Sequence, residues 1–141
     1  MKGRGEALIF QKGYKKMNRN GRYAFYGSLR KGMQNYCLYE EDLVYLKTVE
    51  LGGFKMYSLA HYPYIVKTGN AGHKIVADLF AVTNPATEQT IHKMELDAGY
   101  IFSEIEIAHI KFGIYLFETA SADNSEVTGG DWSTYRKLSG F

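Results

Sequence analysis

Residues 23–32 read Tyr-Ala-Phe-Tyr-Gly-Ser-Leu-Arg-Lys-Gly. The aromatic first half favours a short β-strand, and Gly27 permits a sharp exit from it that a side chain would obstruct. In such a turn, successive backbone N–H groups can point into one concavity and hold an anion or a developing oxyanion. A plain strand-to-loop connection fits the same spacing, so these residues alone leave both interpretations open.

Beyond this stretch, apolar runs bounded by turn residues predict further strands. They cover residues 43–51, 54–59, 62–66, 73–82, 102–107 and 111–117. Gly52 and Gly53 separate the first two runs and predict a hairpin between them, because glycines accept the positive φ of a tight turn. Pro63 predicts that the third run is an edge strand or an extended segment, because proline cannot donate to a central ladder.

The clearest predicted helix covers residues 85–96. Asn84 is a good N-cap, and proline suits the first helical position that follows it. Glu95 falls within or beside the apolar arc of this helix. Because burying an unpaired charge is costly, this carboxylate must be paired, protonated or facing a cleft. A bond to His92, on an adjacent helix face, is one such pairing, and we interpret His92 itself as a surface residue.

Four stretches resemble, in this order, the γ-glutamylcyclotransferase-like family, which includes the AIG2-like proteins. They are residues 26–32, residues 62–66, Met94-Glu95 followed by Gly99-Tyr100, and residues 130–135. The resemblance covers nearly the whole chain after its N-terminal arm. It implies one α+β domain in which a mixed, strongly curved sheet, approaching a small barrel, packs against the predicted helix.

The resemblance also implies an enzyme that cyclises a γ-glutamyl amine or peptide to 5-oxoproline and releases the amine. Glu95 would be the general acid/base, with a pKa raised towards neutrality by partial burial. The implied substrate-binding residues are Tyr26, Gly27, Ser28, Leu29, Arg30 and Tyr100. Backbone N–H groups of residues 27–29 would hold a carboxylate or the developing oxyanion. Such a reaction uses a small γ-glutamyl molecule and requires no metal or organic cofactor.

Two other classes of function remain open. A protein of this family could instead be a non-catalytic module that binds a small ligand or another protein. The basic N-terminal arm, residues 1–21, could tether nucleic acid, since residues 1–22 hold seven Lys and Arg side chains against one Glu. A disordered, solvated tail fits the same composition, as does a natural start at Met17. The domain itself is predicted to cover residues 22–141.

The composition argues against several further classes. A chain of 141 residues suits one domain, and no apolar run approaches the length that spans a bilayer, so no membrane partner is expected. A net charge of +2 argues against nucleic acid as the main partner. The single cysteine, Cys37, cannot form an internal disulfide, which favours a reducing compartment such as the cytoplasm. The four histidines lack the spacing of a zinc site.

Overall fold

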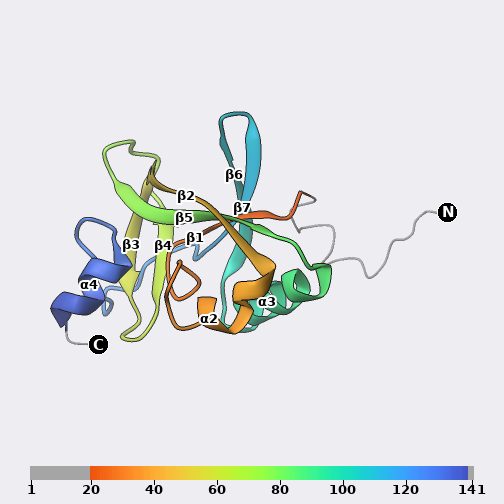
Figure 1. The fold of residues 1–141 in the computed structure, drawn as a ribbon. Coiled ribbons are helices and arrows are strands. Elements are labelled where there is room, and N and C mark those ends of the chain that lie inside the picture. The colour runs from red at the N-terminus through yellow and green to blue at the C-terminus, as the bar shows by residue number, and fades with distance from the viewer. Residues whose placement is uncertain (1–19, 140–141) are drawn as a thin grey trace.

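The computed structural model describes residues 20–139, in which helices lie against strands of two sheets (Figure 1). The basic arm predicted at residues 1–21 lies outside the described residues except for its last two. The larger sheet has the order β2-β5-β1-β7-β6 and the smaller one pairs β3 with β4. The strands are β1 (Arg22–Phe25), β2 (Leu43–Gly52), β3 (Phe54–Ser58), β4 (Pro63–Lys67), β5 (Lys74–Val82), β6 (Ile101–Ile107) and β7 (Ile110–Leu116). The helices are α2 (Tyr36–Tyr39), the 3-10 turn η1 (Glu40–Asp42), α3 (Pro85–Asp97) and α4 (Trp132–Ser139).

The predicted α+β class with a mixed, curved sheet is confirmed. Strand β1 runs antiparallel to β5 and parallel to β7, so both kinds of pairing occur in the larger sheet. The expected approach to a small barrel stops short of closure, because the strands of residues 20–139 do not form a closed ring. The β3–β4 pair approaches the end of β7 through a hydrogen bond from the Phe117 N–H to the Ile65 carbonyl, 3.0 Å long. That contact docks the small sheet on the large one without completing a barrel.

The hairpin predicted at Gly52 and Gly53 is wrong. Gly53 does have the positive φ of +94° that a glycine turn implies. The strands on its two sides nevertheless enter different sheets, since β2 pairs with β5 and β3 pairs with β4. The partner of Gly52 is Lys74, far along the chain. A local glycine pattern cannot predict which strand β2 pairs with, because its partner is β5, a long buried strand much later in the chain.

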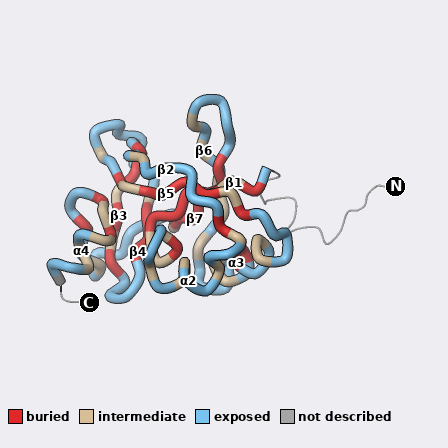
Figure 2. Tube along the Cα trace, in the orientation of Figure 1, coloured by how far each residue is buried: buried red, intermediate tan, exposed pale blue. Residues whose placement is uncertain are grey.

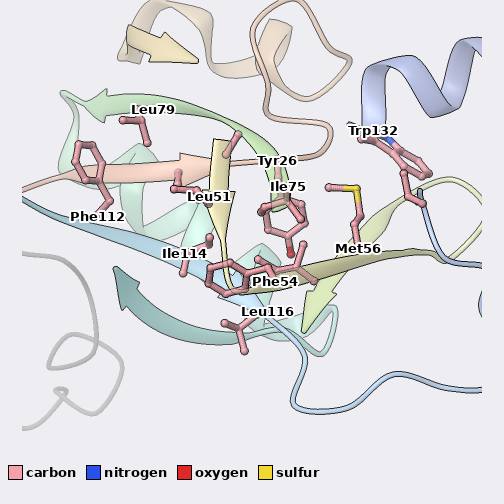
Figure 3. Close-up of a cluster of buried hydrophobic side chains, with 14 residues drawn as sticks. Tyr26, Leu51, Phe54, Met56, Ile75, Leu79, Phe112, Ile114, Leu116 and Trp132 are labelled. Atoms are coloured by element: carbon pink, nitrogen blue, oxygen red, sulfur yellow. The ribbon is translucent and has the colours of Figure 1, made fainter. Parts of the chain in front are cut away.

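Two hydrophobic clusters form the core, and the alternation of residues in β1 separates them. Tyr23 and Phe25 belong to one cluster, whereas Ala24 and Tyr26 belong to the other, as the period of two in a strand requires. Figure 2 shows that the buried segments gather in the central strands while much of β2 and the outer faces of the helices are exposed. Figure 3 shows Tyr26 in the cluster that extends to Trp132, which is fully buried at the start of α4.

Helix α3 begins at the predicted residue and ends at Asp97, one residue beyond the predicted end. The Asn84 side chain accepts a hydrogen bond from the Ala86 N–H at 2.9 Å, which caps the N-terminus, and Pro85 is the first helical residue. Ile91 is buried in the cluster that contains Phe80. No helix within residues 20–139 is long and apolar enough to cross a membrane.

Candidate active site

One pocket lies where the end of β1 meets the last turns of α3 and the start of β4. Its volume is about 390 Å³, which is at the small end of the range for small-molecule sites. The chain leaves β1 through residues 27–29, which we call the glycine loop, and all three of its residues line the pocket together with Glu95. Two segments far apart in the sequence are therefore brought together, as their predicted roles require.

Glu95 faces this pocket without a charged or hydrogen-bonding partner for its carboxylate among residues 20–139. His92, the predicted alternative partner, instead places its ring Nδ1 2.7 Å from the Tyr115 hydroxyl. Burial raises the pKa of Glu95 to about 7, since protein atoms around the carboxyl group disfavour its charged form. A group with such a pKa can both accept and donate a proton near neutral pH.

The glycine loop lines the same pocket and has backbone N–H groups that are not engaged elsewhere in the described chain. No hydrogen bond found within residues 20–139 uses the N–H of Gly27, Ser28 or Leu29 as its donor. The Ser28 carbonyl, by contrast, accepts from the N–H groups of Asn35 and Tyr36, at 3.0 and 3.1 Å, which fixes the course of the loop. The loop is thus anchored through its acceptors while its donors remain available to a ligand.

Gly27 is required by a close approach to Pro63, at the start of β4. A Cβ atom at position 27 would lie 2.9 Å from Cγ and 3.0 Å from Cδ of the proline ring. The Tyr100 hydroxyl donates to the Pro63 carbonyl at 2.6 Å and so holds this strand end in place. Pro63 cannot move away from Gly27 without breaking that hydrogen bond.

We therefore expect Gly27→Ala to push the glycine loop out of position. Overpacking of this kind costs about 1–3 kcal/mol of stability, and the shift should lower activity at least tenfold, because small displacements of catalytic groups are costly. Gly32→Ala is the matched control. Gly32 has a φ of +81°, so alanine is also strained there, but no atom lies within 4 Å of its added Cβ. Equal activity of the two folded variants would contradict the expectation.

Two predicted tyrosines wall the pocket with their rings. Tyr26 and Tyr100 both line it. The Tyr26 hydroxyl donates to the Tyr115 carbonyl at 2.5 Å, and the Tyr100 hydroxyl is held by Pro63. Because both hydroxyl hydrogens are already engaged, these side chains shape the cavity more than they offer donors to a ligand.

Arg30 does not line the pocket. Its Nε lies 3.3 Å from Asp78 and its Nη1 lies 2.9 Å from Asp131, with only 11% of the arginine side chain exposed. Asp78 also accepts from the Lys31 N–H at 2.9 Å and from the Thr48 hydroxyl at 2.7 Å. The guanidinium thus ties the segment after the glycine loop to β5 and to the start of α4. The predicted contact of Arg30 with substrate finds no support in this arrangement.

The expectation that His92 is a surface residue is wrong, and Tyr115 was missed. His92 is only 5% exposed, and Tyr115, its hydrogen-bond partner, lines the pocket. The alternation of residues in β7 could have indicated the position of Tyr115. Phe112, Ile114 and Leu116 point into one cluster, so Tyr115 points to the opposite face and into the other cluster.

The buried pair of His92 and Tyr115 is joined by the hydrogen bond between Nδ1 and the hydroxyl oxygen. Burial lowers the pKa of His92 and favours its neutral form. Its Nε2 has no hydrogen-bond partner within residues 20–139. Either the Nδ1–H donates to the Tyr115 oxygen or the Tyr115 hydroxyl donates to Nδ1, and the tautomer of His92 decides which.

No three His, Cys, Asp or Glu side chains of residues 20–139 lie close enough together to hold a metal ion. Cys37 is exposed.

The sequence matches the family model described as gamma-glutamyl cyclotransferase, AIG2-like, over residues 23–134. The chain therefore belongs to this family. No curated protein matches the sequence.

Solved structures share the fold at low sequence identity. An uncharacterised protein from Pyrococcus horikoshii is 24% identical with a TM-score of 0.70, and the match covers 84% of this chain and 95% of that one. An AIG2-like protein from Mus musculus is 13% identical with a TM-score of 0.56, covering 73% and 80%. Allophanate hydrolase from Kluyveromyces lactis is 14% identical with a TM-score of 0.68, covering 88% of this chain but 22% of that one. These likenesses concern the fold alone.

Proposed function

We propose that this protein is a γ-glutamylcyclotransferase, which converts a small γ-glutamyl amide to 5-oxoproline and releases the amine. One observation carries the proposal: an unpartnered Glu95, whose pKa is raised to about 7, lines the same pocket as the unused N–H groups of the glycine loop. Membership in the family supports the same reaction.

The proposed reaction is an intramolecular acyl transfer. The substrate's α-amino nitrogen attacks its γ-carbonyl carbon, which forms a five-membered lactam and breaks the bond to the leaving nitrogen. Glu95 accepts the protons that the α-nitrogen loses and delivers them to the leaving nitrogen, so it ends in its starting state. Nucleophile and electrophile belong to one molecule, and a pocket that holds it folded supplies much of the rate through proximity. The steps are proton and acyl transfers, and they require no metal or organic cofactor.

The glycine loop is proposed to stabilise the charge that develops on the carbonyl oxygen. The N–H groups of Gly27, Ser28 and Leu29 are the donors in this proposal, because no hydrogen bond within residues 20–139 uses them. Losing one such donor in other enzymes typically costs about 10²–10³ in rate. Tyr115 also lines this cavity.

The proposed location is the cytoplasm. The basis is composition, because a chain whose single cysteine is exposed suits a reducing compartment.

Release of 5-oxoproline, measured by mass spectrometry, tests the proposal. The purified full chain is incubated with γ-glutamyl amides and γ-glutamyl dipeptides, and the Glu95→Gln variant serves as the control. Product that accumulates with the natural chain and stays at background with the variant is the expected result. Binding of these compounds by calorimetry, without product, would instead identify a non-catalytic binding module.

A further inference from the structure

We infer that the leaving group is apolar and has no ionic group besides the nitrogen that is released, as in an alkylamine or arylalkylamine, rather than an amino acid or a polyamine. This inference rests on the proposed function and concerns the part of the pocket that is lined by the connection between β3 and β4, the start of β4 and the apolar residues at the end of α3.

The walls of that part are made of apolar and aromatic side chains. Leu59, Tyr62 and Pro63 come from the connection between β3 and β4 and the start of β4, and Met94 and Ala98 come from the end of α3. The reacting γ-carbonyl must lie between Glu95 and the glycine loop in the proposed reaction. The leaving group is then the portion of the substrate that contacts the remaining walls.

Charge in this pocket is confined to one side chain. Glu95 is the sole ionic side chain among the described residues that line it. The two cations that follow the glycine loop are directed elsewhere, since Arg30 pairs with Asp78 and Asp131, and the Lys31 ammonium lies 4.7 Å from the centre of the Tyr45 ring. A carboxylate on the leaving group would therefore find no cation among the lining residues.

An ammonium group on the leaving amine would be disfavoured for a different reason. Its one available counter-ion in the pocket is Glu95. Pairing with it would stabilise the ionised carboxylate and occupy the group that must exchange protons with the substrate. Desolvating an ammonium against apolar walls is also costly when it has no dedicated partner.

The rim of the pocket offers apolar surface that a hydrocarbon chain could cover. Leu59 and Tyr62 are 40% and 44% exposed, although both are large hydrophobic side chains and both line the cavity. Covering such surface is favourable in proportion to the apolar area removed from water. Each methylene added to the leaving group should raise kcat/KM roughly threefold to fivefold until the chain passes the rim.

Matched pairs of substrates test the inference. The first pair is γ-glutamylbutylamide and γ-glutamylnorvaline, and the norvaline compound has one additional carboxylate. The second pair is γ-glutamylpentylamide and γ-glutamylputrescine, and the putrescine compound has an ammonium in place of the terminal methyl group. We expect the uncharged member of each pair to have at least a tenfold higher kcat/KM. Equal or faster turnover of both charged members would overturn the inference while leaving the cyclotransferase reaction intact.

A charge introduced at the rim provides a second test. Leu59→Glu should raise kcat/KM for the putrescine compound relative to the pentylamide at least fivefold. Ile110→Glu is the matched control, because Ile110 is also 40% exposed and does not line the pocket. An unchanged ratio in the folded Leu59→Glu variant would contradict the assignment of this wall to the leaving group.

Binding separates failure of the inference from failure of the reaction. If no compound yields 5-oxoproline, the proposed function fails. Calorimetry with the same pairs and the Glu95→Gln variant then decides the preference of the pocket, because it needs no turnover. Tighter binding of the uncharged members supports an apolar site, and equal or tighter binding of the charged members overturns it.

Discussion

Glu95→Gln is expected to lower kcat for 5-oxoproline release by about 10²–10⁴-fold, the usual contribution of a general acid/base. Glutamine keeps the size of the side chain and its capacity to hydrogen-bond, but it cannot exchange protons. In the natural chain, kcat/KM should fall as the pH drops below about 7, because the base form of Glu95 is lost there. The measurement is the rate of product formation across pH 5–9.

The stability of the same variant distinguishes a catalytic carboxylate from a structural one. Burial raises the pKa of Glu95 from 4.5 to about 7, so between these values the folded protein binds more protons than the unfolded chain. The stabilisation that comes from protonated Glu95 is therefore fully present below pH 4.5 and is lost as the pH rises through about 7. At pH 8, where the natural chain holds a partly buried charge, Glu95→Gln should be more stable by about 1–3 kcal/mol.

Glu88→Gln is the matched control for these measurements. Glu88 lies on the same helix and is partly buried, but it accepts a hydrogen bond from the Tyr23 hydroxyl and does not line the pocket. Its substitution should leave the rate within a few-fold of the natural value. A Glu95→Gln variant that is less stable at pH 8 and keeps its activity would assign Glu95 a structural role only.

Arg30→Met is expected to cost about 3–5 kcal/mol of stability, because it leaves a buried carboxylate without its cation. The Asp78 side chain is 4% exposed, and Arg30 is its ionic partner. The Lys31 N–H and the Thr48 hydroxyl remain as donors, but neither carries a charge. Activity should fall as well, since this ion pair anchors the chain beside the glycine loop. Urea unfolding followed by circular dichroism measures the effect.

An exposed ion pair and a double variant provide the controls. Lys93→Met removes a pair with Asp97 whose side chains are 77% and 65% exposed, and it should cost no more than about 1 kcal/mol. Adding Asp78→Asn to Arg30→Met should recover part of the lost stability, because the uncompensated charge is then gone. An Arg30→Met variant as stable as Lys93→Met would contradict a structural role for Arg30.

The features that were predicted from the sequence depend on neighbours along the chain. Asn84 and Pro85 define the start of α3 by local capping, and the runs at residues 102–107 and 111–117 correspond to strands β6 and β7, which pair with each other. The meeting of Glu95 with the glycine loop was expected from the family resemblance, and both segments line one pocket. No periodicity in the sequence could bring together segments so far apart.

The features that were missed depend on partners far away in the sequence. Gly53 has the backbone of a tight turn, yet β2 pairs with β5 because of contacts that form only in the folded chain. Arg30 was expected to contact the substrate because it follows the glycine loop, but in the folded chain it pairs with Asp78 and Asp131. A rule that treats a lone charged residue near a loop as exposed cannot anticipate such buried partners.

A crystal structure of the Glu95→Gln variant with bound γ-glutamylbutylamide tests the central claim most directly. We expect the γ-carbonyl oxygen within hydrogen-bond distance of N–H groups of the glycine loop, and the α-amino nitrogen within reach of the side chain at position 95. The butyl group should lie against Leu59 and Tyr62. A ligand bound outside this pocket, or one whose α-amino nitrogen faces away from position 95, would contradict the proposed catalytic role.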